Sequence, residues 1–317
     1  MKKLLAIALA LTLVLSAGGA LATTYISLGT GGTAGTYYAL GAEIASVWMN
    51  NIQDLNVDVQ PTDASKDNIV FICEGDIDVA TVQNDASAYA YAGNDFFGGE
   101  VFDDFYAIGF LYPEAVQLFV AADSDIQTIA DLKGKDVSVG AAGSGTYMNA
   151  VQVLEAGGLK IEDINPQYLS FAETATAFQD MQIDAGFVTS GVPNTALIEV
   201  TTKREIRLLG LSDEQWEYMT STYEFYTPYA VAAGTYAGMA EDTTVPAIGA
   251  LLICKRDLDE QLVYDLTKTM FELKDQIGHA KAKELDPARA VTGVPVPFHP
   301  GAARYYAEKG LTVTVGE

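Results

Sequence analysis

The sequence predicts an α/β protein built from two lobes. Strand-like runs alternate with helix-like runs along most of the chain, which is the pattern of layered α/β structure. About 295 residues follow an N-terminal export segment, more than one typical core of about 100–150 residues accommodates. The triplet GTY opens a predicted helix at residues 35–37 and again at 145–147, each time after a strand and a loop of small residues.

The predicted strands are short runs rich in β-branched and aromatic residues. We expect them at residues 25–29, 55–60, 78–83, 107–112, 115–122, 136–140, 184–190, 206–211 and 249–254. The predicted helices show the 3.6-residue spacing of apolar positions. We expect them at residues 36–50, 64–75, 146–158, 174–182, 213–224, 259–277 and 300–310.

The chain is expected to cross between the lobes twice, first just before residue 114 and again near residue 254. The long amphipathic segment at 259–277 should pack in the first lobe, because it follows the second crossing. A doubly crossed chain makes one discontinuous lobe and one continuous lobe. The predicted boundaries are therefore 23–113 and 255–317 for lobe 1, and 114–254 for lobe 2.

The N-terminus has the three-part pattern of a secretory signal. Two lysines precede an apolar stretch from Leu4 to Leu15, and small residues end at Ala22. The stretch is too short to span a bilayer as a stable helix. We therefore expect residues 1–22 to be a signal peptide cleaved near Ala22, a periplasmic or other extracytoplasmic location, and no direct insertion into lipid.

Beyond that segment, 16 basic residues stand against 42 acidic ones, a net charge of −26. Binding to nucleic acid needs a basic footprint, so no nucleic-acid partner is expected. Cys73 and Cys254 are the only cysteines, and the sequence leaves open whether they pair.

Three glycine-rich or polar loops each follow a predicted strand and precede a helix start, at residues 29–36, 140–146 and 188–194. The first N–H groups of a helix have no internal partner, and the helix dipole makes this end positive, so such loops suit a small anion. None of the three contains Lys or Arg. Gly29, Gly31 and Ala34 also match the dinucleotide pattern G-x-G-x-x-G/A, but an exported protein meets little NAD.

Five segments resemble solute-binding proteins of TRAP transporters of the TAXI type. They are TGGTAGTYYALG, VATVQND, LKGKDVSVGAAGSGT, DAGFVTSGVPN and FHPGAARYYAEKG. The resemblance implies a type II periplasmic-binding-protein fold, in which two lobes close on a ligand like a Venus flytrap. It also implies transport as the function, with a small carboxylate such as glutamate, a related dicarboxylate or another amino acid delivered to the membrane subunits of a sodium-coupled TRAP permease.

Carried onto this chain, the resemblance places ligand-binding residues in both lobes. Lobe 1 would contribute Thr33, Gly35, Thr36, Tyr37 and Gln83, and lobe 2 would contribute Ser144, Gly145, Thr146, Ser190, Gly191 and Val192. Because no arginine or lysine is among them, neutral N–H and O–H donors would hold the carboxylate, through charge-assisted hydrogen bonds.

We expect no catalysis, cofactor or metal. His279 and His299 are the only histidines, too few for a typical His-based metal site, and Ser144 is not centred in a G-x-S-x-G nucleophile elbow. Two alternatives stay open: a solute-binding protein of an ABC transporter, and an exported hydrolase.

Overall fold

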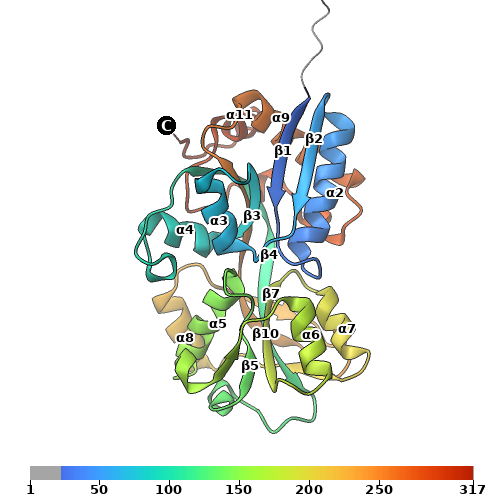
Figure 1. Ribbon diagram of the computed structural model, residues 1–317, viewed down its shortest axis with the longest axis vertical. Helices are drawn as coiled ribbons and strands as arrows, with labels where there is room; N and C mark the ends of the chain where they lie inside the picture. The colour runs from blue at the N-terminus through green and yellow to red at the C-terminus, as the bar shows by residue number, and fades with distance from the viewer. Residues whose placement is uncertain (1–22, 317) are drawn as a thin grey trace, which may run out of the picture.

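The computed structural model describes residues 23–316, so the predicted signal peptide lies outside the described residues. The chain forms two stacked lobes joined by two long strands (Figure 1). These are β4 (Phe105–Ala121) and β10 (Thr243–Lys255), which pair with each other antiparallel. Within residues 23–316, no helix has the length and apolar character needed to cross a membrane.

Lobe 1 is a sheet with helices packed around it. The parallel strands are β1 (Thr24–Gly29), β2 (Leu55–Gln60) and β3 (Val79–Gln83), in the order β2-β1-β3, and β3 pairs antiparallel with β10. The helices of this lobe are α2 (Thr36–Asn51), α3 (Ser65–Glu74), α4 (Asn84–Ala92), α9 (Glu260–Glu272), α10 (Pro287–Ala290) and α11 (Pro300–Glu308). Since α9 to α11 come from the end of the chain, this lobe is built from both ends of the described sequence.

Lobe 2 continues the same sheet. Strand β7 (Ala185–Ser190) pairs antiparallel with β4, and β5 (Asp136–Ser138) lies parallel between β7 and β6 (Asn165–Gln167). Strand β8 (Ile206–Leu208) pairs with β4, and β9 (Thr227–Val231) pairs with β10. Its helices are α5 (Gly145–Ala156), α6 (Phe171–Gln179), α7 (Thr195–Thr201) and α8 (Asp213–Thr222). Short 3₁₀ turns, η1 (Asp95–Phe97), η2 (Ile129–Leu132), η3 (Ile161–Asp163), η4 (Lys274–Gln276) and η5 (Ala280–Glu284), complete the chain.

The strand β4 corrects one prediction. The sequence indicates two strands, at 107–112 and 115–122, with Pro113 between them, but the structure has one strand that runs from lobe 1 into lobe 2. Pro113 stands opposite Gly249 of β10 and Glu114 opposite Ile248, so the proline is accommodated within the ladder. The chain therefore passes between the lobes inside regular strands. The exact domain boundaries stay a prediction.

Several shorter elements also differ from the expectation. Helices α4, α7 and α10 and strands β6 and β9 are not predicted from periodicity. Helix α6 begins at Phe171 and not at Thr174, because the Ser170 side chain accepts a hydrogen bond from the Glu173 N–H and caps the helix there.

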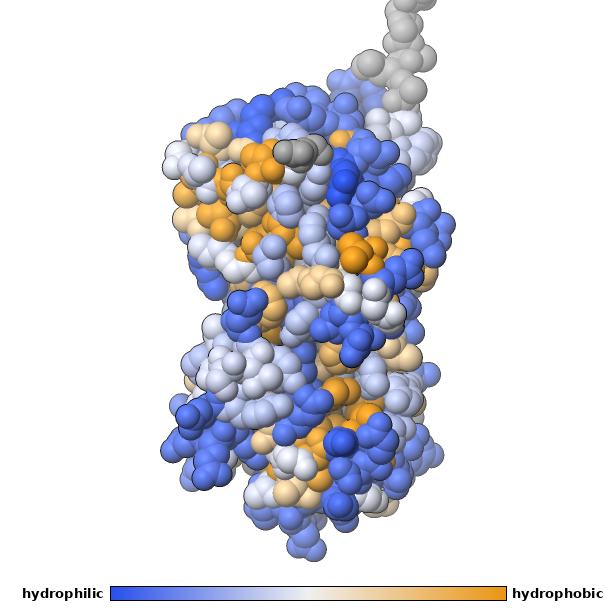
Figure 2. All heavy atoms as spheres, turned by 90° about the vertical axis from the view of Figure 1, so that its left-hand side faces the viewer, coloured by the Kyte–Doolittle hydropathy of each residue, from blue (hydrophilic) through white to orange (hydrophobic). Residues whose placement is uncertain are grey.

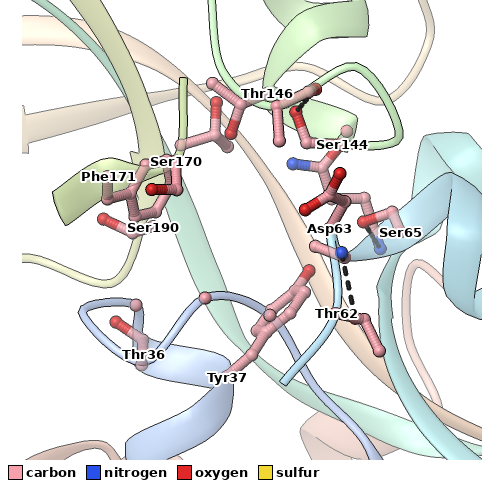
Figure 3. Close-up of a pocket in the computed structure, with 18 of the residues that line it drawn as sticks. Thr36, Tyr37, Thr62, Asp63, Ser65, Ser144, Thr146, Ser170, Phe171 and Ser190 are labelled. Carbon is pink, nitrogen blue, oxygen red and sulfur yellow. Dashed lines mark hydrogen bonds between the residues drawn. The ribbon is translucent and has the colours of Figure 1, made fainter. Parts of the chain in front are cut away.

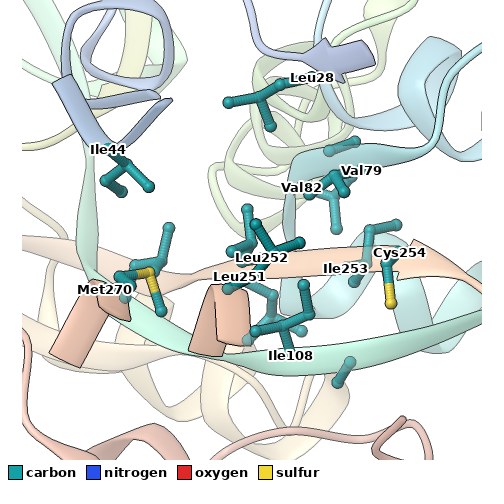
Figure 4. Packing of buried hydrophobic residues seen from close by; sticks show 14 of the residues in the cluster. Leu28, Ile44, Val79, Val82, Ile108, Leu251, Leu252, Ile253, Cys254 and Met270 are labelled. Carbon is teal, nitrogen blue, oxygen red and sulfur yellow. The ribbon is translucent and has the colours of Figure 1, made fainter. Parts of the chain in front are cut away.

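Apolar side chains from both long strands anchor them in the core of lobe 1. Leu251, Leu252 and Ile253 of β10 pack with Ile108 of β4 and with residues of β1, β3 and α9 (Figure 4). Two further apolar clusters lie in lobe 2. On the face that Figure 2 shows, hydrophilic residues are interspersed with hydrophobic areas on both lobes, and the outline narrows between the lobes. Both cysteines are free, which answers the question of pairing that the sequence leaves open.

Candidate ligand-binding site

A cavity lies between the two lobes, where the carboxyl ends of β1 and β3 face the loops of lobe 2 (Figure 3). The cavity has a volume of about 60 Å³. A cavity that holds one water molecule needs roughly 10–15 Å³ by the same measure, so this one suits a small metabolite. It is lined by Gly31, Gly32, Gly35, Thr36, Tyr37, Thr62, Asp63, Ala64, Ser65, Gln83, Glu114, Ala141, Ser144, Gly145, Thr146, Ser170, Phe171, Thr189 and Ser190.

Helix α2 directs its N-terminus at this cavity from lobe 1. Gly35 is the N-cap, and since it has no side chain, nothing from it caps the first turn. The N–H groups of Thr36 and Tyr37 have no acceptor among the residues that the structure describes. They are the unpaired donors that a helix of this length leaves at its positive end.

Helix α5 does the same from lobe 2. Its N-cap is Ser144, whose hydroxyl accepts from the Tyr147 N–H at 3.1 Å and donates to the Ala141 carbonyl at 2.6 Å. The hydroxyl is thus engaged by its own loop, and the donors left for a ligand are the backbone N–H groups of Gly145 and Thr146. Two helix ends, one from each lobe, face one cavity.

The third predicted loop behaves differently. The Asn194 side chain accepts hydrogen bonds from the N–H groups of Ala196 and Leu197 at 2.9 and 3.3 Å. The start of α7 is therefore satisfied by its own N-cap, so the N–H groups of Ala196 and Leu197 are not available to a ligand. Whether the loop at residues 188–194 offers N–H groups to a ligand stays a prediction. Ser190 still lines the cavity.

Eight of the eleven predicted ligand residues line the cavity. The other three are Thr33, Gly191 and Val192. Thr33 lies at a neighbouring surface depression, and Gly191 packs against the Lys281 side chain. Whether any of the eleven binds the ligand stays a prediction.

Glu114 is the main feature of the site that the sequence reasoning misses. It is 1% exposed, lines the cavity, and accepts a hydrogen bond from the Tyr37 hydroxyl at 2.6 Å. Burial raises the pKa of its carboxyl to about 8, against the lowering effects of the Tyr37 hydrogen bond and of Lys281. A signal was available, because Glu114 is the only charged residue in the 17 residues of β4.

The sequence reasoning also misses two polar segments of the lining. Residues 62–65 enter from lobe 1, and Ser65 accepts a hydrogen bond from the Gln83 N–H at 3.1 Å. Ser170 and Phe171 enter from lobe 2, at the start of α6. Figure 3 shows both segments around the space into which the Tyr37 hydroxyl points.

One buried cation lies near the site, although no Lys or Arg lines the cavity. Lys281 of η5 is 6% exposed, and its ammonium group binds Glu284 at 2.7 Å. A Cβ added to Gly191 would lie 2.6 Å from Lys281 Cε, so the lysine sits directly behind the β7 end of the site. Among the described residues, the charged side chains that line the cavity are the acids Asp63 and Glu114, and Lys281 lies behind the lining.

Hydrogen bonds tie the two lobes together beside the cavity. The Gly143 carbonyl of lobe 2 accepts from the N–H groups of Lys66 and Asp67, at the start of α3 in lobe 1, at 3.0 and 3.2 Å. The Gln83 amide donates to Asn149 Oδ1 at 3.0 Å, and Asn149 Nδ2 donates to Asp85 at 3.0 Å. The lobes are thus in direct polar contact around the site.

The histidines have structural roles. His299 caps α11 by accepting from the Gly301 N–H at 3.1 Å, and its other ring nitrogen contacts the Leu258 carbonyl at 2.9 Å. His279 accepts from the Lys281 N–H at 3.2 Å. Residues 23–316 contain no group of His, Cys, Asp or Glu that could hold a metal ion. The Ser144 hydroxyl is hydrogen-bonded to the Ala141 carbonyl and the Tyr147 N–H of its own segment.

Solved structures share this architecture. A structure from Bordetella bronchiseptica RB50 aligns with a TM-score of 0.51 and 17% identity, over 89% of this chain and 88% of that one. A putative L-cystine ABC transporter protein from Listeria monocytogenes aligns with a TM-score of 0.50 and 14% identity, over 86% of this chain and 98% of that one. The chain has the type II periplasmic-binding-protein fold, as predicted.

A curated relative matches a shorter region. It is named a putative aliphatic sulfonates-binding protein of Escherichia coli (strain K12), and it is 37% identical over 87 residues. This match spans 27% of the present chain and 27% of the relative.

The assignment to the TAXI-type proteins of TRAP transporters is wrong. Glycine-rich strand-to-helix loops carried that resemblance, and such loops recur wherever helix N-termini line an interlobe cleft. A family model instead matches residues 28–310, nearly all of the described structure. On that match, the chain belongs to the NMT1-like family.

Proposed function

We propose that this chain is an extracytoplasmic solute-binding protein that captures a small organic anion, a carboxylate or a sulfonate, for an ABC transporter. The observation that carries the proposal is the pair of helix N-termini, α2 and α5, whose unpaired N–H groups face one cavity from opposite lobes. An anion between them would be held by aligned dipoles and by charge-assisted hydrogen bonds.

The protein works by binding, without catalysis. The lobes separate by bending at β4 and β10, the ligand enters, and closure adds contacts that only the closed form makes. The hydrogen bonds from Lys66 and Asp67 to Gly143 are contacts of that kind, because their donors and acceptor come from different lobes.

The comparisons support the ligand class and the partner. The relative from Escherichia coli is named a putative aliphatic sulfonates-binding protein, and aliphatic sulfonates are small anions. The neighbour from Listeria monocytogenes is named a putative L-cystine ABC transporter. A sulfonate and a carboxylate both present oxygens that accept from backbone N–H groups, so the same helix ends serve either.

A thermal-shift screen over small carboxylates and sulfonates tests the proposal. A ligand at about 100 times its dissociation constant adds about 2.7 kcal/mol to stability, which should raise the melting temperature by several degrees. If no carboxylate or sulfonate shifts the melting temperature, the proposal fails.

Two substitutions at Thr36 then test where the anion binds. Thr36 is the first residue of α2 and Gly35 before it is extended, so Thr36→Pro removes one N–H donor in a position that proline tolerates. We expect Thr36→Pro to weaken the binding of the anion by about 10- to 100-fold, because it removes one hydrogen bond to a charged group. Thr36→Ala keeps the N–H group and is the matched control. We expect calorimetry to show a smaller loss of anion affinity for Thr36→Ala than for Thr36→Pro. Equal losses in the two variants would contradict a role for the helix end.

A further inference from the structure

Glu114 presents the cavity with a carboxyl group that an anionic ligand alone does not explain. Its only hydrogen bond to the described residues is the one from the Tyr37 hydroxyl to Oε2, so Oε1 has no donor. At 1% exposure, the carboxyl is nevertheless part of the cavity lining. Oε1 is not among the fully buried polar atoms that lack a partner, so this oxygen is open to the cavity, where a donor on the ligand can reach it.

Building on the proposed function, we infer that the ligand carries an ammonium group beside its anionic group, and that Glu114 receives this ammonium. The ligand would then be a small amino acid or aminosulfonate, held at its anion by α2 and α5 and at its amine by Glu114. Each charge of the ligand would meet the opposite charge or dipole in the site.

In the part of the chain that the structure describes, the surroundings of Glu114 supply no cation for this role. Lys281 is bound to Glu284 at 2.7 Å, and it is absent from the lining. Tyr37 of α2 and Tyr112 of β4 are buried phenols, and Asp85 of α4 is a further buried acid. The groups that face Glu114 are therefore neutral or acidic apart from the occupied Lys281.

A second carboxyl group lines the cavity. Asp63, an exposed acid between β2 and α3, is part of the same lining as Glu114. Gln83 Oε1, by contrast, is fully buried without a partner and lies against Gly145, so it is closed to a ligand in the cavity. The lining thus combines unmet N–H donors at the helix ends with the carboxyl groups of Glu114 and Asp63, which is the complement of a zwitterion.

The inference predicts that binding releases a proton. Burial raises the pKa of Glu114 to about 8, so at pH 7 the empty site holds a proton on this carboxyl. An ammonium group favours the charged carboxylate and displaces that proton. A purely anionic ligand has the opposite need, because it binds only while Glu114 stays protonated, and its affinity should fall as pH rises past 8.

Matched pairs of probes that exchange an amine for a hydroxyl test the inference by calorimetry: taurine with isethionate, L-alanine with L-lactate, and L-glutamate with L-2-hydroxyglutarate. We expect the amine member of at least one pair to bind 30-fold or more tightly than its partner, with about one proton released at pH 7. If hydroxyl members bind as tightly as amines or more tightly, the inference is overturned and the proposed function stands. If no member binds, the proposed function fails and the inference fails with it.

The variant Glu114→Gln separates recognition of the amine from general damage. The glutamine keeps an acceptor for Tyr37 but removes the charge, so we expect the preference for the amine to fall at least tenfold and proton release to disappear. Affinity for the hydroxyl member should change less than threefold. Glu217→Gln on the exposed face of α8 is the matched control. If Glu114→Gln keeps its melting temperature and retains the amine preference, Glu114 is not the receptor.

Discussion

At the scale of single residues, two buried carboxyl groups at the junction of the lobes form no ion pair with any lysine or arginine of residues 23–316. Glu114 has one hydrogen bond, from Tyr37, and Asp85 accepts from Asn149 Nδ2 and from the Ala86 N–H at 2.7 Å. Burial raises the pKa of Asp85 to about 7 and that of Glu114 to about 8. Both groups therefore keep their protons in the folded chain at pH values where ordinary carboxyls have lost them.

This predicts a stability that declines as pH rises. The unfolded chain releases both protons near pH 4, whereas the folded chain holds them up to about pH 7 and 8, so between these values the folded state binds more protons. The free energy of unfolding should then fall from pH 5 to pH 8, by about 1.4 kcal/mol per pH unit for each group in its interval.

The variant Glu114→Gln isolates one of the two groups. Urea denaturation at pH 5, 6, 7 and 8 should show a decline that is smaller than in the wild type by a few kcal/mol. Glu217→Gln, on the exposed surface, should leave the wild-type decline unchanged. Parallel curves for Glu114→Gln and the wild type would show that Glu114 does not hold its proton in the folded state.

At the scale of elements, local sequence predicts the donors of the site but not its acceptors. Helices α2 and α5 follow glycine-rich loops, and both loop composition and apolar spacing indicate where they begin. Glu114 lies on β4, where Pro113 suggests a break between two strands. Only the pairing of β4 with β10 makes the strand continuous and buries Glu114, and that pairing is a tertiary contact.

Helix α4 shows a second limit of local patterns. Its sequence NDASAYAYA has small and polar residues, and Asn84, Asp85 and Ser87 are buried along with Ala86 and Ala90. A helix buried on a polar face has no 3.6-residue apolar stripe to detect. Its polar residues are buried because they meet partners in lobe 2 and β10, among them Asn149 and Gly249.

The close approach of α5 to β3 predicts the effect of one methyl group. A Cβ added to Gly145 would lie 1.8 Å from Gln83 Oε1 and 2.2 Å from its Cδ, and Asn149 holds that amide in place. Gly145→Ala should therefore oppose closure of the lobes and weaken ligand binding by about tenfold or more. Because alanine is tolerated at the start of α5, lobe 2 itself should stay folded. Calorimetry and the melting temperature measure the two effects separately.

A double substitution checks the cause of this loss. In Gly145→Ala with Gln83→Ala, the colliding amide is gone, so the double variant should bind more tightly than the sum of the two single losses predicts. Strictly additive losses would show that the methyl group acts by something other than its contact with Gln83.

At the scale of the whole molecule, two strands carry the connection between the lobes. β4 and β10 pair along most of their length. Along its other edge, β10 pairs with β9 up to Ala247 and with β3 from Ala250 onward. Opposite that exchange lies Glu114, paired with Ile248. The ligand cavity thus sits on the segment that must bend when the lobes separate, which couples contacts at Glu114 to opening and closing.

The net charge of the chain sets how charged ligands approach this cleft. With 42 acidic and 18 basic residues, the molecule repels anions, and the screening length falls from about 30 Å at 0.01 M salt to about 8 Å at 0.15 M. Association of glutamate, which has a net negative charge, should accelerate by about threefold over this range. Association of taurine, a zwitterion without net charge, should change little and is the control. Stopped-flow rates for glutamate that fall as salt is added would show that a positive local field in the cleft outweighs the acidic surface.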